Sequence, residues 1–221
     1  FENVPVDGLL STEYAKTQSN RINPNQAMSN PSAGNPRLGD DTIYLSVVDK
    51  DRNVVSFINS LFHGFGSGLV AGDTGILLQN RGAGFSLDPS HANCIASHKR
   101  TMHTIIPGMI ARDGMPLVTF GVMGGQMQPQ GHLQLVSNLI DFNMDVQSAL
   151  DAPRFRVMDD GNISLERGIS DSISNQLREK KHHIIPPNTF FGGGQAIFVH
   201  PEYKTLIAGS DPRRDGCAVG Y

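Results

Sequence analysis

The stretch Gly39-Asp40-Asp41-Thr42-Ile43-Tyr44-Leu45-Ser46-Val47-Val48-Asp49 decides how the rest of the chain is interpreted. A polar, turn-forming segment ends at Asp41, and a run of branched and aromatic residues that favours a β-strand begins at Thr42. If the backbone were cut before Thr42, the strand would begin with a residue that carries both a free amine and a hydroxyl. Such a pair can act as base and nucleophile together. A threonine at the start of a strand is more commonly only a strand former, so the motif alone leaves both interpretations open.

The composition indicates a globular protein rather than a disordered one. The chain has 221 residues, of which 38% are hydrophobic and 18% charged, enough for a sizeable core. Its net charge is −3, which argues against a nucleic-acid partner. No apolar stretch approaches the roughly 20 residues that a membrane-spanning helix needs, so no span is expected. The chain begins at Phe1 without an initiator methionine, and we expect it to be part of a longer protein whose compartment the sequence does not indicate.

The residues before Thr42 differ in composition from those after it. Residues 1–41 are polar, with one short helix expected near residues 9–16 and capped by Ser11. The segment 20–41 is dominated by Asn, Pro, Ser and Gly, a composition typical of a flexible linker. We therefore place a boundary at Thr42, between a tail at 1–41 and a main body at 42–221.

Periodicity predicts strands, then helices, then strands in the main body. Strands are expected at 42–48, 53–59, 104–111, 117–121, 196–200 and 205–208, and a short buried run at 76–78. Helices are expected within 129–152 and 170–181, with Asp145 and either Ser170 or Asp171 as N-caps. The buried face of the first helix is expected to consist of Leu133, Val136, Leu139 and Ile140. This order predicts an α+β fold with two layers of antiparallel sheet and helices outside.

Two glycines, Gly124 and Gly125, follow the predicted strand 117–121 and precede the first helical stretch. They are explained either by a plain turn or by an oxyanion hole, in which adjacent backbone N–H groups point at one substrate oxygen. The glycine-rich segment 64–68 lacks the Gly-Lys-Ser/Thr ending of a phosphate-binding loop. The eight histidines show no metal-binding spacing, so no metal site is expected.

Several ordered blocks of the sequence resemble the γ-glutamyltranspeptidase family. They are Asp41-Thr42 with Leu45–Asp49, Phe65–Gly68, Gly75–Leu78, Lys99-Arg100, Gly124-Gly125, Asp151–Phe155, Ser210–Arg213 and Gly220-Tyr221. The match extends from about residue 1 to residue 221. By this resemblance, 1–41 is the tail of the family's large subunit with a flexible linker, and 42–221 is the whole small, catalytic subunit.

The resemblance implies an N-terminal-nucleophile hydrolase with an αββα sandwich, made as an inactive precursor. Thr42 would attack the carbonyl of Asp41, cleave the bond between them and then carry the acyl group during hydrolysis or transfer. The implied substrates are small γ-glutamyl or glutaryl-type amides, and the implied partner is the large subunit of the same precursor. No metal or organic cofactor is implied. Ser60 matches a family threonine that hydrogen-bonds the nucleophile, and Gly124 and Gly125 match the family's oxyanion hole.

The donor-binding positions depart from the family pattern. The family holds the α-amino group of a glutamyl donor with Asn, Gln or Glu, and Asp, and the matching residues are Phe62, Arg81 and Gly84. An ammonium beside Arg81 would be repelled and left without acceptors. The serine pair that binds the donor carboxylate matches His103 and Thr104, which can still donate hydrogen bonds. The resemblance therefore points to a branch similar to acylases that remove glutaryl-type side chains from cephalosporins.

Two alternatives stay open at the level of sequence. One is an ordinary glutathione-cleaving γ-glutamyltransferase whose contacts to the amine come from elsewhere in the protein. The other is a non-catalytic member that stays uncleaved and acts as a structural or binding protein. The state of the bond between Asp41 and Thr42 would distinguish the last alternative from the two enzymes.

Overall fold

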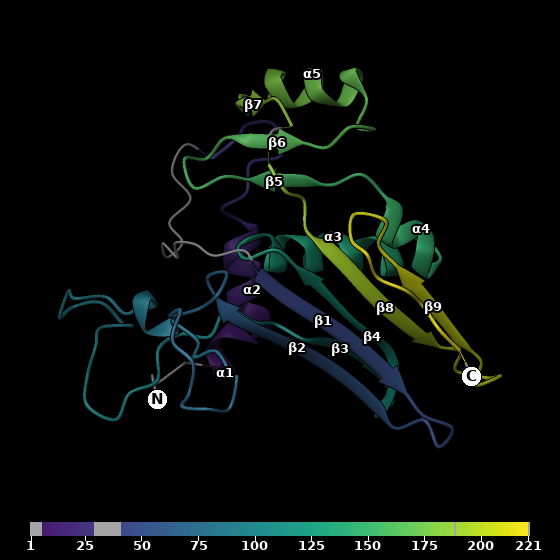
Figure 1. Cartoon of the computed structure of the whole chain (residues 1–221). Helices are drawn as coiled ribbons and strands as arrows, with labels where there is room; N and C mark the ends of the chain where they lie inside the picture. The colour runs from purple at the N-terminus through teal and green to yellow at the C-terminus, as the bar shows by residue number, and fades with distance from the viewer. Residues whose placement is uncertain (1–5, 29–40, 188, 221) are drawn as a thin grey trace.

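The computed structural model describes residues 6–28, 41–187 and 189–220 (Figure 1). Helices α1 (Val6–Leu9) and α2 (Thr12–Ser19) precede the main body. The predicted cap is confirmed, because the backbone N–H of Tyr14 donates to Oγ of Ser11 over 3.1 Å. Most of the expected linker, residues 29–40, lies outside the described residues.

The main body begins with an antiparallel hairpin of β1 (Asp41–Val48) and β2 (Val54–Phe62), as predicted. The turn is built by Asp49, whose carboxylate accepts from the backbone N–H of Asp51 at 2.9 Å and of Asn53 at 2.8 Å. The side chain of Asn53 donates a further hydrogen bond to this carboxylate, and it is the largest cause of the lowered pKa of Asp49, followed by the backbone hydrogen bonds. The local turn chemistry therefore accounts for the register of the hairpin.

A second antiparallel sheet has the order β3-β4-β8-β9. Its strands are β3 (Gly108–Arg112), β4 (Met115–Met123), β8 (Gly193–Val199) and β9 (Leu206–Ser210), which confirms both predicted hairpins with shifted ends. The β1–β2 hairpin packs on one face of this sheet through Tyr44, Ile58 and Met123 (Figure 1). Gly121 permits this close approach, because a Cβ there would lie 2.3 Å from the ring of Tyr44.

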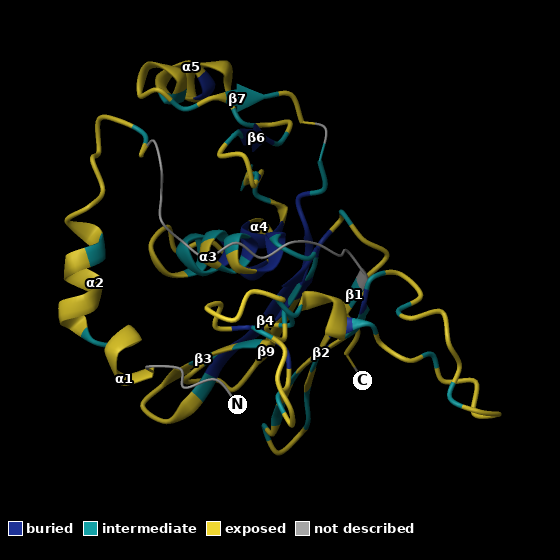
Figure 2. Cartoon of the chain, turned by 90° about the vertical axis from the view of Figure 1, so that its left-hand side faces the viewer, coloured by how far each residue is buried: buried dark blue, intermediate teal, exposed yellow. Residues whose placement is uncertain are grey.

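Two helices, α3 (Met127–Ile140) and α4 (Val146–Asp151), cover the opposite face of the larger sheet. The main core lies between them and the sheet, and Figure 2 shows the buried residues concentrated there. It comprises Leu117, Val118, Phe120, Val122, Leu135, Val146, Ala149, Leu150 and Ala196. The predicted N-cap of α4 is confirmed, since Asp145 Oδ1 accepts from the N–H of Ser148 at 3.0 Å.

The expected buried face of α3 is partly wrong. Leu133 is 66% exposed and Ile140 is exposed, whereas Leu135 is 1% exposed. The reason is Gly131, where a Cβ would lie 2.6 Å from Cγ1 of Val122. The helix therefore approaches β4 along the side that carries Gly131 and Leu135.

A smaller unit follows α4. It consists of β5 (Phe155–Val157), β6 (Ile163–Leu165), α5 (Asp171–Glu179) and β7 (Ile184–Ile185). Ser170 caps α5, as predicted, but β6 and β7 pair in parallel, which the antiparallel prediction did not anticipate. The run 76–78 is not buried as expected, because Ile76 and Leu78 are exposed. No helix among the described residues is long and apolar enough to cross a membrane.

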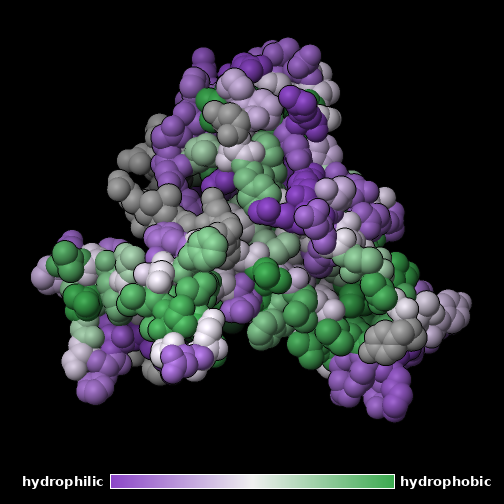
Figure 3. Space-filling model, viewed as in Figure 1, coloured by the Kyte–Doolittle hydropathy of each residue, from purple (hydrophilic) through white to green (hydrophobic). Residues whose placement is uncertain are grey.

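The α+β prediction is confirmed, with two sheet layers face to face and α3 and α4 outside the larger one. The outward face of the β1–β2 hairpin is left uncovered by the described residues. It carries the exposed side chains of Ile43, Leu45, Val47, Val55 and Phe57. Figure 3 shows hydrophobic side chains gathered over this hairpin.

Candidate active site

Thr42 lies on β1 where the pairing with β2 is irregular. Asp41 pairs with Phe62 and Ile43 pairs with Asn59, so the register shifts across Thr42. Two residues of β2 therefore lie opposite Thr42, in the manner of a β-bulge, and one of them is Ser60. Bulges of this kind re-aim a side chain at the end of a strand pair.

A cavity of about 720 Å³ opens beside this bulge. Thr42 and Ser60 line it on the hairpin side, and Met123 lines it from the end of β4. The loop after β9 supplies Arg214 and Asp215. Of the residues predicted from the sequence, Thr42 and Ser60 are thus brought together on the wall of one cavity large enough for a small molecule.

Three more predicted residues cluster behind Ser60. Arg81 opens the short 3₁₀ helix η1 (Arg81–Gly84) and is only 3% exposed. Its Nη1 donates to Oγ1 of Thr104 at 3.0 Å, and its Nη2 donates to the carbonyl oxygen of Ser60 at 3.1 Å and also contacts Oγ of Ser60. The guanidinium lies 5.7 Å from the ring centroid of Phe62, within the range of a cation–π interaction.

In the part of the chain that the structure describes, no carboxylate balances the charge of Arg81. Among the described residues, no acidic side chain lies within ion-pair distance of its guanidinium. Burial accordingly lowers the pKa of Arg81. A buried cation that is held only by neutral acceptors places a positive potential directly behind Ser60.

Phe62 has an unusual backbone. Its φ is +82°, a left-handed conformation that is rare for a bulky side chain, although the residue is buried. The turn brings its N–H within 3.3 Å of Oγ of Ser60, to which it donates. The strained backbone thus places the N–H of Phe62 on the hydroxyl of a residue that lines the cavity.

Gly84 and His103, also predicted as substrate contacts, do not line the cavity. The carbonyl oxygen of Gly84 accepts from Nδ2 of Asn93 at 2.7 Å. His103 is exposed, and its Nδ1 lies 3.1 Å from the carbonyl oxygen of Thr101. Asn93 also donates to Oγ1 of Thr101, so the two segments are fixed to each other.

Gly124 and Gly125 follow Met123 at the end of β4 and have φ values of +124° and +55°. A Cβ at Gly124 would lie 2.8 Å from the ring of Phe190, so the position requires glycine. Among the described residues, neither backbone N–H has a hydrogen-bond acceptor. Two adjacent N–H groups without an acceptor among the described residues are what an oxyanion hole requires. They follow Met123 of the cavity wall, but neither glycine itself lines the cavity.

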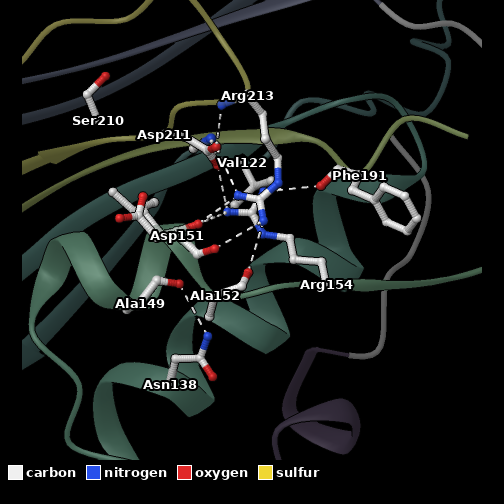
Figure 4. Close-up of polar contacts among 12 residues, drawn as sticks. Val122, Asn138, Ala149, Asp151, Ala152, Arg154, Phe191, Ser210, Asp211 and Arg213 are labelled. Carbon is white, nitrogen blue, oxygen red and sulfur yellow. Dashed lines mark hydrogen bonds and ion pairs between the residues drawn. The ribbon is translucent and has the colours of Figure 1, made fainter. Parts of the chain in front are cut away.

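The loop that carries Arg214 and Asp215 is held by a buried ion network (Figure 4). Asp211 Oδ2 lies 2.7 Å from Nη2 of Arg154 and its Oδ1 lies 3.0 Å from Nη1 of Arg213. Glu166 Oε2 accepts from Nη2 of Arg213 at 2.6 Å. The network thereby ties the end of β9 to the segments before β5 and after β6.

The pKa values of the two arginines of the network shift in opposite directions. Burial lowers the pKa of Arg154, against the opposing charge of Asp211. Burial also acts to lower the pKa of Arg213, but hydrogen bonds to Glu166 and the charge of Asp211 outweigh it and raise that pKa. The carboxylates of Asp211 and Glu166 thus fix the loop on two sides.

Sequence reasoning missed Arg214 as a residue of the cavity wall. Its guanidinium stacks 4.0 Å from the ring centroid of Phe190, the same ring that approaches Gly124. The block Ser210–Arg213 carries part of the family resemblance, but nothing local indicates that the next residue lines the same cavity as Thr42. No group of three or more His, Cys, Asp or Glu side chains in the described ranges could hold a metal ion.

Comparisons with known proteins agree with the geometry. The sequence profile of the family described as Gamma-glutamyltranspeptidase matches residues 1–221. The chain is 38% identical to the glutathione hydrolase-like YwrD proenzyme of Bacillus subtilis, covering 100% of this chain and 42% of that protein. It is 34% identical to the oxamate amidohydrolase proenzyme of Klebsiella pneumoniae, covering 99% and 42%.

A solved structure gives the same result. The cephalosporin acylase from Bacillus halodurans superposes with a TM-score of 0.88 at 43% identity, covering 99% of this chain and 40% of that one. The chain thus spans about two fifths of the length of these relatives. The expected N-terminal-nucleophile hydrolase fold is confirmed by this similarity. The chain belongs to the γ-glutamyltranspeptidase family.

Proposed function

We propose that this chain is part of a self-processing amidohydrolase or acyltransferase whose nucleophile is Thr42. The precursor is cleaved between Asp41 and Thr42, which makes 42–221 the small subunit and 1–41 the end of the large subunit. The observation that carries the proposal is the joint position of Thr42 and Ser60 on one cavity wall, next to the strand end that leads into Gly124. The relatives named as proenzymes support the cleavage.

The mechanism follows from these groups. Once the α-amine of Thr42 is free, it takes the proton of Oγ1, because an α-amine has a pKa of about 7.7–8.0 and is a suitable base near neutrality. The oxygen attacks the amide carbonyl of the substrate, and the resulting oxyanion accepts hydrogen bonds from the N–H groups of Gly124 and Gly125. The amine leaves with a proton, and water or another amine then removes the acyl group from Thr42.

The proposed substrate is an amide whose acyl part carries a carboxylate but no α-ammonium group. Phe62 offers no acceptor, Gly84 offers no side chain, and Arg81 repels a cation. His103 and Thr104 match the family's carboxylate-binding pair and can still donate hydrogen bonds, although neither lines the cavity. Support comes from relatives named cephalosporin acylase and oxamate amidohydrolase. The enzyme should therefore prefer glutaryl-type amides to γ-glutamyl amides.

The proposed partner is the large subunit of the same precursor. In the described residues, β1 and β2 form a two-stranded sheet with open edges and an exposed apolar face. Open edges and apolar patches of this kind are normally covered in a stable protein. About three fifths of the length of the relatives lies outside this chain, and we expect the corresponding part of the precursor to cover the hairpin.

The test uses intact-mass spectrometry on the purified full-length protein, with Thr42→Ala and Thr42→Ser as variants. We expect the wild type to consist of two fragments split before Thr42, Thr42→Ser to be cut more slowly, and Thr42→Ala to stay whole. Wild-type protein that stays whole would contradict the proposal and favour a dormant structural protein.

Specificity is tested on the processed enzyme with glutaryl- and γ-glutamyl-p-nitroanilide. A glutaryl preference of at least tenfold, or roughly 1.4 kcal/mol of transition-state free energy, is expected. Equal rates, or faster γ-glutamyl cleavage, would refute the substrate assignment while leaving the nucleophile intact.

A further inference from the structure

The hydroxyl group of Ser60 has both of its acceptor positions occupied. A serine hydroxyl offers one donor and two acceptor lone pairs. Its Oγ accepts from Nη2 of Arg81 and from the backbone N–H of Phe62 at 3.3 Å. Neither partner can accept in return, since a guanidinium and a backbone N–H are donors only. The Ser60 hydroxyl can therefore act toward any third group only as a donor.

The remaining direction for that proton is the cavity. No described residue accepts a hydrogen bond from Oγ of Ser60. Ser60 and Thr42 line the same cavity across the irregular β1–β2 pairing. Thr42, which lies opposite Ser60 in this pairing, carries a hydroxyl oxygen that can accept that proton.

We propose that Arg81 is a positioning residue, which acts through Ser60 by fixing the Ser60 hydroxyl as a donor to Oγ1 of Thr42. The inference rests on the proposed role of Thr42 as nucleophile and deepens it. With Ser60 donating, the proton of Thr42 cannot pass to Ser60 and must go to the freed α-amine. Arg81 thereby sets the direction of proton transfer without touching the substrate.

The same arrangement favours attack and release. As the Thr42 oxygen gains negative charge on its way to the carbonyl carbon, the hydrogen bond from Ser60 becomes charge-assisted and stronger. The Arg81 cation behind Ser60 polarises that O–H bond further, because the guanidinium is buried and its field is little screened by water. When the ester is later cleaved, the same donor stabilises the departing Thr42 oxygen.

The environment of Arg81 suits this role better than direct binding of substrate. The side chain is 3% exposed and does not line the cavity. Its remaining partner, Thr104, holds the guanidinium by Nη1 while Nη2 is directed to Ser60. Burying a cation without a carboxylate is unfavourable, so its retention calls for a function.

The test is a double-mutant cycle between Ser60→Ala and Arg81→Met in the full-length protein. Two rates are measured for each variant, the self-cleavage rate by mass spectrometry and kcat of the processed enzyme. In the wild-type background, Arg81→Met should lower both rates about 30-fold, the scale of an important hydrogen-bonding group, with KM changed less than threefold. In the Ser60→Ala background the same change should lower them less than threefold.

Equal losses in the two backgrounds, or a loss confined to KM, would overturn the inference. Arg81→Lys keeps a cationic donor and should retain at least a tenth of kcat. Arg81→Leu, which also removes the donor, replaces Arg81→Met in the cycle if that variant does not fold by circular dichroism. Arg178→Met on α5 is the matched control and should leave both rates unchanged. Cleavage and activity that survive Thr42→Ala would refute the proposed nucleophile itself, which is a different outcome from additivity in the cycle.

Discussion

Replacement of Asp211 by asparagine tests the ion network that holds the cavity wall. The carboxylate is 1% exposed and lies 2.7 Å from Arg154, which is itself 2% exposed. It also accepts from the backbone N–H groups of Gly194 at 2.9 Å and of Arg213 at 3.0 Å. Asp211→Asn keeps the size of the side chain and removes its charge.

The expected loss follows from what remains around Arg154. Its other acceptors are the carbonyl oxygens of Leu150 and Phe191, both at 3.1 Å, so the buried cation would have no nearby full counter-charge except Glu166 across Arg213. Removing one partner of a buried pair costs about 3–5 kcal/mol, and an amide oxygen keeps part of the hydrogen bonding. We therefore expect about 3 kcal/mol of lost unfolding free energy.

The assay is urea unfolding of the full-length protein, followed by far-UV circular dichroism at pH 7. The matched control is Asp51→Asn, which breaks the Lys50–Asp51 pair, whose side chains are 87% and 65% exposed. An exposed pair contributes about 0–1 kcal/mol, so this variant should unfold like the wild type. A loss below about 1 kcal/mol for Asp211→Asn, or an equal loss in both variants, would refute the stabilising role of the network.

Three further outcomes follow from the fold and the site. Gly121→Ala places a methyl group 2.3 Å from the ring of Tyr44, so it should destabilise by about 1–3 kcal/mol and slow cleavage before Thr42, as urea unfolding and mass spectrometry would show. Gly124→Ala disturbs a free N–H group and should lower kcat about 10²–10³-fold in a steady-state assay. Burial lowers the pKa of His132 to about 4. The unfolded chain then binds the proton first, so stability is complete above about pH 6.5 and falls by about 3 kcal/mol by pH 4, measurable as a shift in urea midpoint.

Each of these outcomes has a matched comparison. Gly82→Ala has open space around its Cβ and should be nearly neutral, so an equal loss there would contradict the steric argument for Gly121. Gly161 has a positive φ of +81°, as Gly124 does, but no crowding around its Cβ position. Gly161→Ala should therefore lower stability without lowering kcat, and it is the control for Gly124→Ala. The His132→Gln variant should lack the fall in unfolding free energy between about pH 6.5 and pH 4. An unchanged pH profile would show that the imidazole is not neutral in the folded protein.

Local features of the sequence were sufficient for much of the fold. The hairpin turn was predictable because Asp49 and Asn53 are typical turn residues, and they make the expected hydrogen bonds. Asp145 and Ser170 were predicted as caps for the same reason. The buried face of α3 was mispredicted because hydrophobic periodicity does not register Gly131, whose missing side chain decides which face approaches β4.

The candidate site was predictable only in part, because its decisive contacts join distant segments. Thr42 was identified from a break in composition beside a strand, which is a local signal. The contact between Arg81 and Ser60 spans 21 residues, and that between Arg81 and Thr104 spans 23. The resemblance named all these positions as site residues, but no local signal indicates that Arg81 lies behind Ser60 rather than in the cavity.

The three departures from the family pattern, at Phe62, Arg81 and Gly84, are best explained together. Arg81 and Gly84 are the ends of the same 3₁₀ turn, in which side chains three residues apart lie on one side. An aspartate at 84, as the family carries, would be positioned to pair with Arg81 and draw its guanidinium away from Ser60. Phe62 covers the guanidinium at 5.7 Å and contributes its N–H to the same hydroxyl. With glycine at 84 and phenylalanine at 62, neither side chain competes with Ser60 for the guanidinium of Arg81. The same two residues provide no acceptor for the α-ammonium group of a substrate, so the contact with Ser60 and the loss of ammonium binding have one cause.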